Sequence, residues 1–298
     1  MRFRFLVPAA CALGALSLAA SPTRAAIEEN LSGLNADQAT GYLDPFVKGL
    51  STSVNTGIFR SGAVPKVGFS LTVDLRAAFI KFSDDDRAYT ATSEGFETVE
   101  APTVIGDTQA VEAEHESVDG LHFHYPGGFD MENFGVAVPQ LTIGNIAGTR
   151  AIVRWIPEVD FSDDDIGKFE MFGIGGQHSI SQYLPALPVD VAAGIMYQNF
   201  KLGEDLLEAD ALAFNVTGSK RFGAVISLEP YVGVGMDSFS MKVEYETDDD
   251  ETTEVEFDRQ NDFHLTLGTS INLPGVKLNG EFNMAAVNGF AGGVSFGI

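Results

Sequence analysis

The sequence predicts an all-β protein, a transmembrane antiparallel β-barrel of about ten strands preceded by a short N-terminal helical segment. Three observations predict this fold. The chain begins with an export signal, it contains long stretches in which apolar and polar residues alternate, and its acidic clusters all fall on one side of the predicted strands.

The first 25 residues have the features of a secretory signal peptide. Arg2 and Arg4 provide the positive start, residues 5–20 are apolar, and small residues around Thr23 and Ala25 precede the expected cleavage site. The only cysteine, Cys11, lies within this stretch; Pro8, where a lipoprotein signal has Leu, argues against a lipid anchor. No apolar run of about 18 residues follows, so no membrane helix is expected. The exported chain is therefore a secreted soluble protein or a membrane barrel.

The composition excludes several classes of protein. The 298 residues include 42 acidic and 18 basic ones, a net charge of −24, which disfavours binding to nucleic acid. One cysteine excludes a disulfide-stabilised scaffold. A hydrophobic content of 45% is too high for a disordered chain.

Alternation over residues 66–82 separates a barrel from a soluble β-sandwich. One face of this stretch carries only apolar residues: Val67, Phe69, Leu71, Val73, Leu75, Ala77 and Phe79. The other face is mostly polar or small. Similar runs cover 263–273, 276–284 and 289–298. Runs this long, with an apolar face and a polar face, favour a barrel with lipid outside and polar residues inside.

Weaker alternation predicts the remaining strands, which cover 133–145, 149–157, 168–177, 188–202, 209–219 and 224–246. The total is ten, and bacterial barrels have an even number. Pro139 and Pro230 interrupt two of these strands, which barrels tolerate mainly near a rim or a bulge.

The connections between the predicted strands form two sets. The set expected outside the cell covers 83–132, 158–167, 203–208, 247–252 and 284–288, and it contains every acidic cluster. The short set, 146–148, 178–187, 220–223 and 274–275, is expected in the periplasm. This topology places both chain ends on the periplasmic side.

Residues 26–64 form the segment before the barrel, which we take to be residues 65–298. Apolar residues recur at helical spacing from Ala39 to Leu50, and Asp44-Pro45 fits the start of a helix. We expect two short amphipathic helices that meet there. They form either a cap over the periplasmic mouth, favoured by the narrow interior of a ten-stranded barrel, or a plug that enters the lumen. The small residues of 289–297 leave space for the second arrangement.

Several motifs resemble those of an uncharacterised family of bacterial outer-membrane β-barrel proteins. The matching residues are Tyr42-Leu43-Asp44-Pro45, Gly49, Asn55-Thr56-Gly57, Gly148-Thr149, Arg154-Trp155-Ile156-Pro157, Gly173-Ile174-Gly175, Gln177-His178 and Leu187-Pro188-Val189-Asp190. The resemblance covers residues 40–298 and implies an outer-membrane barrel without an assigned activity. The chain is also distantly similar to long-chain fatty-acid outer-membrane transporters, whose barrels are larger.

Charged residues on the inner face of the strands are the candidate functional residues. The lumen-facing candidates are Asp74, Arg76, Arg150, Arg154, Glu229, Asp237, Lys277 and Glu281, with Lys168, Glu170, Asp190 and Asp262 as further members. Paired charges that fill a small barrel are structural, whereas the same charges around an open channel select ions. The narrow interior favours a packed lumen.

We expect no metal site, no cofactor and no catalytic site. His122 and His124 could share a metal, but no third ligand is spaced for it, and the Asp triplets lack the calcium-loop pattern. A serine hydrolase needs a Ser–His pair at the outer rim. His178-Ser179 falls on the periplasmic side, and His264 has no evident serine partner.

These observations predict an exported bacterial outer-membrane protein, a small channel or transporter for small or hydrophobic solutes. A non-conducting structural or surface-interaction barrel is the alternative, and a secreted soluble β-protein is a third possibility. The expected partners are outer-membrane lipid, lipopolysaccharide and the barrel assembly machinery. The last of these would recognise residues 293–298, which resemble a C-terminal assembly signal although that signal more often ends in Phe.

Overall fold

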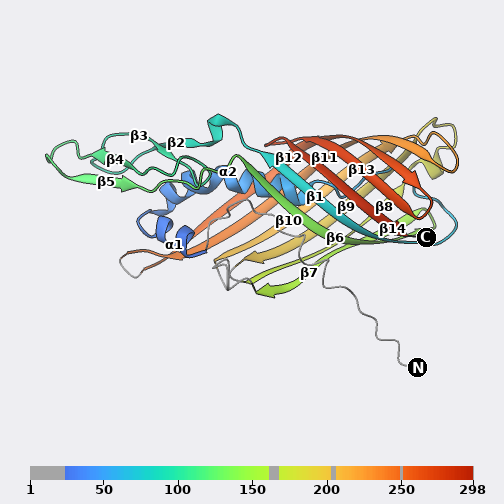
Figure 1. Ribbon diagram of the computed structural model, residues 1–298, viewed down its shortest axis with the longest axis horizontal. Coiled ribbons are helices and arrows are strands. Elements are labelled where there is room, and N and C mark those ends of the chain that lie inside the picture. The colour runs from blue at the N-terminus through green and yellow to red at the C-terminus, as the bar shows by residue number, and fades with distance from the viewer. Residues whose placement is uncertain (1–23, 161–167, 203–205, 249–250, 298) are drawn as a thin grey trace, which may run out of the picture.

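The computed structural model describes residues 24–160, 168–202, 206–248 and 251–297. Ten antiparallel strands close into one barrel, as predicted, and each strand pairs with its neighbours in sequence (Figure 1). The strands are β1 (Ser70–Lys81), β6 (Asn133–Ile146), β7 (Thr149–Asp160), β8 (Lys168–Ser179), β9 (Asp190–Leu202), β10 (Leu207–Ser219), β11 (Ser227–Glu246), β12 (Thr252–Leu273), β13 (Val276–Met284) and β14 (Gly289–Gly297). Pairing of β1 with β14 completes the ring.

The barrel has two unlike ends. The connections that follow β6, β8, β10 and β12 lie at one end, which we call the turn end; the connections that follow β1, β7, β9, β11 and β13 lie at the other, the loop end. Pro139 and Pro230 pair with Leu75 and Thr269 in uninterrupted register, so neither proline breaks its strand.

The long connection after β1 folds into two hairpins at the loop end. A 3-10 turn, η2 (Asp84–Asp86), leads into β2 (Ala88–Ala91) and β3 (Val99–Pro102), then β4 (Val111–Glu114) and β5 (His122–Tyr125). We call residues 83–132 the lobe. Its hairpins extend away from the barrel (Figure 1). A second short 3-10 turn, η4 (Ser181–Tyr183), lies at the turn end.

Two helices precede the barrel, but the break between them is not where the sequence predicted it. Helix α1 covers Arg24–Ser32, and α2 covers Ala36–Asn55 and continues through Asp44-Pro45. The break falls instead at Asn35, whose side chain accepts a hydrogen bond from the Gln38 amide, while the Gln38 side chain accepts one from the Asn35 amide, both at 3.0 Å. This capping box starts α2 nine residues earlier than Asp44-Pro45 would. Proline removes only one helical hydrogen bond, and the surrounding strands support the helix on several sides.

Of the two arrangements left open for the segment before the barrel, the structure has the plug that enters the lumen and not the cap over its mouth. Helix α2 enters the barrel from the loop end (Figure 1), and the chain continues through the lumen until the Gly62 amide bonds to Ser219 Oγ, at the last residue of β10. We call residues 43–62 the plug. At the loop end the Asp248 amide donates to the Ser32 carbonyl of α1. The first described residues therefore lie at the opposite end of the barrel from the C-terminal end of β14. The N-terminal end of the chain, and with it the expectation that both chain ends lie on the periplasmic side, falls outside the described residues.

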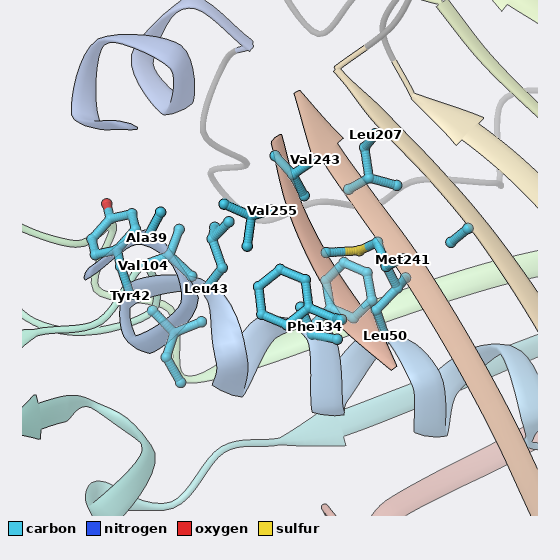
Figure 2. Close-up of a cluster of buried hydrophobic side chains, with 14 of the residues drawn as sticks. Ala39, Tyr42, Leu43, Leu50, Val104, Phe134, Leu207, Met241, Val243 and Val255 are labelled. Atoms are coloured by element: carbon cyan, nitrogen blue, oxygen red, sulfur yellow. The ribbon is translucent and has the colours of Figure 1, made fainter. Parts of the chain in front are cut away.

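An apolar core at the loop end explains this arrangement. Leu43 and Leu50 of α2 pack among apolar side chains that point inward from β6, β10, β11 and β12, including Phe134, Leu207 and Met241 (Figure 2). An amphipathic helix has its lowest free energy where its apolar stripe is covered, and the loop-end interior offers that cover. Among the described residues, no helix is both long enough and apolar enough to cross a membrane.

Candidate functional site: the plugged lumen

All eight predicted lumen residues point into the barrel. Asp74, Arg76, Arg154, Glu229, Asp237 and Glu281 are buried, whereas Arg150 and Lys277 are partly buried near the turn end. The further candidate Glu170 is exposed on the outer face of β8, where it has the same parity as the exposed Phe172 and Ile174. Lys168 also lies away from the lumen, where its ammonium pairs with Glu158.

Arg154 of β7 holds the C-terminal end of α2. Its guanidinium donates to the backbone carbonyls of Val54 at 2.8 Å and Thr56 at 3.2 Å, and to the side-chain oxygens of Gln140 and Gln198. The last carbonyls of a helix lack helical partners and carry partial negative charge, which a cation stabilises. Arg154 therefore fixes the point where α2 ends and the extended part of the plug begins.

Glu281 of β13 binds the plug one residue further along. Its carboxylate accepts hydrogen bonds from the Gly57 amide at 2.9 Å, from Tyr231 Oη at 2.6 Å and from Asn283 Nδ2 at 2.9 Å. The backbone at Gly57 has φ of 76°, a left-handed conformation that glycine adopts at little cost. The turn at Gly57 directs its amide at the carboxylate.

Asp74 and Glu229 bind side chains of the plug. Arg60 donates to Asp74 Oδ1 at 2.6 Å, and Arg76 approaches the same oxygen at 3.4 Å. Glu229 accepts from the Ser61 hydroxyl, from Ser219 Oγ at 2.9 Å and from Arg221 at 3.0 Å. Both carboxylates are almost fully buried, so these bonds replace the water that each charge has lost.

His264 and Asp237 form a buried pair further toward the loop end. Asp237 Oδ2 lies 2.8 Å from His264 Nδ1, and Asn215 Nδ2 lies 3.1 Å from His264 Nε2. His264 borders a small cavity beside Gly57 and Phe59 of the plug. The partner of His264 Nε2 is an amide, and no serine hydroxyl contacts the ring among the described residues.

A model of a protein family of unknown function, DUF6588, matches residues 4–298. The chain belongs to this family. Membership in an uncharacterised family, expected from its motifs, is thereby confirmed. No curated protein matches the chain.

Solved structures similar to this DUF6588 protein are outer-membrane proteins. One is a loop-deletion mutant of OmpT of Vibrio cholerae, at 11% identity, covering 78% of this chain and 98% of that one, with a TM-score of 0.26. Another is a FadL homologue of Pseudomonas aeruginosa, at 10% identity, covering 77% and 88%, with a TM-score of 0.20. Scores this low assign neither a function nor a ligand.

Two pairs of residues considered in the sequence of this DUF6588 chain, His178-Ser179 and His122 with His124, are not arranged as a catalytic or a metal site. Ser179 is buried on the inner face of β8, whereas His178 lies on the outer face and contacts Thr149 and Tyr183. In the lobe, His122 and His124 lie beside one carboxylate, Glu112, at 3.8 and 3.4 Å. Within the described ranges, no group of three or more acidic, histidine or cysteine side chains is placed to hold a metal.

The sequence did not lead us to the uncharged residues of the site or to the residues that the plug contributes to it. Gln140, Gln177 and Gln198 line the lumen, and Arg60 and Ser61 of the plug complete the network. Strand parity could have placed the three glutamines, since each lies an even number of residues from an inward-facing neighbour. Nothing in the sequence marks Arg60 as a lumen residue without knowledge that the plug enters the barrel.

Proposed function

We propose that this protein is exported through residues 1–25 and resides in the bacterial outer membrane, where its barrel is a gated passage for a small solute. The plug is the gate. Membrane residence is supported by the outer surface, on which large apolar side chains are exposed along the strands. Examples are Val73, Phe79, Trp155, Phe214, Val232 and Phe263, each 49–62% exposed. A belt of this kind is stable in lipid and unfavourable in water.

The observation that carries the gate proposal is that the extended half of the plug is held by hydrogen bonds to charged barrel side chains. Arg154, Glu281, Asp74 and Glu229 bind it between Val54 and Ser61. Water can replace hydrogen bonds of this type when the segment moves, so the lumen wall is suited both to hold the plug and to line an aqueous path. The filled lumen agrees with the packed interior that the sequence favoured.

A non-conducting barrel is the second candidate, and a different observation favours it. Helix α2 shares one apolar core with the lobe and with the loop-end strands, in which Tyr42, Val104 and Tyr125 are buried together. Moving α2 would expose that core to water at a large cost in free energy. A gate would therefore involve residues 56–62 with α2 left in place.

An engineered disulfide distinguishes the two candidates. A Cβ added at Gly57 would lie 3.5 Å from Ala291 Cβ, which falls within the range of roughly 3.5–4.5 Å for a disulfide. Cys11 is the only cysteine of the chain and lies in the expected signal peptide, so Gly57→Cys with Ala291→Cys would introduce the only two thiols of the exported protein. The reduced form carries the same backbone strain at Gly57 and is the matched control.

Conductance in planar bilayers is the measurement. For a gate, the wild type opens rarely, Arg154→Gln opens more often, and the oxidised double variant is silent while its reduced form conducts. If Arg154→Gln is less stable but stays silent, and oxidation changes nothing, the gate proposal is wrong and the non-conducting barrel is supported.

The surface supports two further parts of the proposal. Acidic residues such as Asp84, Asp85 and Glu112 are exposed on the lobe, where divalent cations could bridge them to lipopolysaccharide phosphates. Strand β14 is the last strand and pairs with β1, the position from which assembly machinery would close the barrel. Both partners are tested by crosslinking in cells from single cysteines placed in the lobe and in β14.

A further inference from the structure

A cavity of about 190 Å³ opens at the turn end of the lumen, between the start of β1, the β12–β13 turn and the end of β14. Its polar lining consists mainly of Ser70, Thr72, Asn145, Lys277 and Ser295. Lys277 is the only lining residue with a charged side chain, and it comes from the inner face of β13.

The ammonium of Lys277 lacks an acidic partner. Among the described residues, no carboxylate lies within ion-pair distance of it. Glu229 is a carboxylate that acts on it electrostatically, but Glu229 already accepts hydrogen bonds from Arg221, Ser61 and Ser219.

Further positive charge surrounds this ammonium. Arg60, Arg150 and Arg221 all act on Lys277. Arg150 bonds only to neutral acceptors, the Gln177 side chain and the Ser61 carbonyl, so its charge is also uncompensated by a direct ion pair in the described structure. Arg60 shares Asp74 with Arg76, which leaves one carboxylate for two guanidinium groups.

This concentration of cations is not a property of the whole chain. The protein has 42 acidic and 18 basic residues, yet three guanidinium groups act on the one lysine that lines this cavity, and two of the four cations have no direct ion pair in the described structure. A partly buried cluster of like charges is unfavourable unless an anion compensates it. The hydroxyls of Ser70 and Thr72 line the same cavity and can donate hydrogen bonds to an oxyanion.

We propose that this cavity is a binding site for a small oxyanion, a phosphate or a carboxylate, with Lys277 as its principal ligand and Arg150 as a supporting cation. The site occupies the mouth of the lumen, where a free solute or a lipid headgroup could supply the same group. It requires only the folded barrel, so it stands whether or not the plug is a gate.

The test is a titration of the full-length protein in nonionic detergent, in a phosphate-free zwitterionic buffer. Inorganic phosphate and acetate are the free anions, and phosphatidylglycerol mixed into the micelle is the lipid source. Lys277→Gln removes the proposed ligand. Lys220→Gln is the matched control, because Lys220 is exposed at the same end and lies outside the cavity.

Binding of phosphate or acetate that saturates, weakens at least tenfold in Lys277→Gln and is unchanged in Lys220→Gln would support the site for a free anion. Lys277-dependent binding of phosphatidylglycerol alone would support the site with a headgroup as its ligand. Absence of saturable binding by every probe would overturn the proposal, as would equal weakening by both variants, since general surface charge would then explain the affinity. A normal gel shift on boiling shows that each variant is a folded barrel.

Discussion

The two halves of strand β11 face the same way but are built for different surroundings. From Ser227 to Asp237, toward the turn end, the outward side chains are apolar, such as Val232, and the inward ones are polar, such as Glu229. From Phe239 onward the outward residues are polar, such as Ser240, and the inward ones are apolar, such as Met241. The first half is organised as a membrane barrel and the second as a soluble protein. A single strand can thus have an apolar outer face in one half and a polar outer face in the other, while the same alternate residues point outward throughout.

The pairing between β11 and β12 is irregular between Asp237 and Phe239, the point at which this polarity changes. On the turn-end side of this point, His264 and Thr266 of β12 face inward. On the loop-end side, Val255 and Phe257 face inward. The two sets differ in parity, so β12 carries an extra residue there, as a β-bulge does. The bulge lets β12 keep its inner face turned to the plug in both regions.

The largest expected loss of stability comes from a change in the turn-end half of the barrel, whose inner face is polar. Arg154→Ala would leave the Val54 and Thr56 carbonyls and two glutamine side chains without their donor, and we expect it to lower the free energy of unfolding by about 3–5 kcal/mol. Arg87→Ala in the lobe, which breaks an exposed pair with Asp130, is expected to cost less than about 1 kcal/mol. Urea unfolding from lipid vesicles measures both. Equal effects would contradict the role of Arg154 at the end of α2.

The outer face of β11 offers the next test. Val232→Lys would place a charge in the apolar belt and is expected to cost about 2–4 kcal/mol in a bilayer. Ser240→Lys on the same face, nearer the loop end, should change stability by less than about 0.5 kcal/mol. Folding yield in vesicles, read from the gel shift on boiling, compares the two variants. If they fold equally well, the proposed belt does not contact lipid at Val232.

Alkaline pH should affect the loop end through its tyrosines. Burial raises the pKa of Tyr42 and of Tyr89 above the ordinary tyrosine value of about 10. Above that pH the unfolded chain has lost these protons while the folded one retains them, so stability falls as pH rises. We expect protease cleavage of the lobe to increase between about pH 10 and 11.5, and less so in Tyr89→Phe. Tyr183→Phe, at the exposed turn end, is the control and should leave the cleavage profile unchanged.

The smallest effect concerns single hydroxyl groups. Tyr42 Oη accepts a hydrogen bond from Asn30 and donates one to the Gly127 carbonyl, and these two bonds join α1 and α2 to the lobe. Tyr231 Oη donates a hydrogen bond to Glu281 beside the plug. Tyr42→Phe and Tyr231→Phe should each cost about 1 kcal/mol. Protease cleavage of the lobe should increase only in Tyr42→Phe. An increase in Tyr231→Phe would show that the two halves unfold together.

The sequence predicted the barrel well because alternation of apolar and polar residues reports directly on the two faces of a strand. Ten strands, both sets of connections and all eight lumen charges could be read from side-chain parity in strands such as 70–81 and 276–284. Parity depends only on local chain geometry. Glu170 was assigned to the lumen because of its charge and against its parity, which it shares with the outward-facing Phe172 and Ile174.

The path of the plug could not be predicted, because it depends on contacts between distant parts of the chain. The sequence shows that α2 is amphipathic, but its apolar partners, such as Phe134 and Met241, come from strands that were expected to enclose a polar lumen. The Gly57–Glu281 hydrogen bond joins residues 224 positions apart. Likewise Asp44-Pro45 indicated a helix start until the capping box at Asn35 fixed an earlier one.

The position of the plug also constrains the order of assembly. It precedes β1, and it is enclosed by a ring whose final seam joins β1 to β14. A closed ring offers no side entrance, so the plug enters either while the seam is still open or lengthwise through one mouth of the barrel. The first route needs no threading of the two helices, and it would keep the plug bound to partially formed strands until β14 pairs with β1. On this view the strands close around the plug, and a chain that lacks it would have to close a barrel whose buried charged side chains lack the partners that the plug provides.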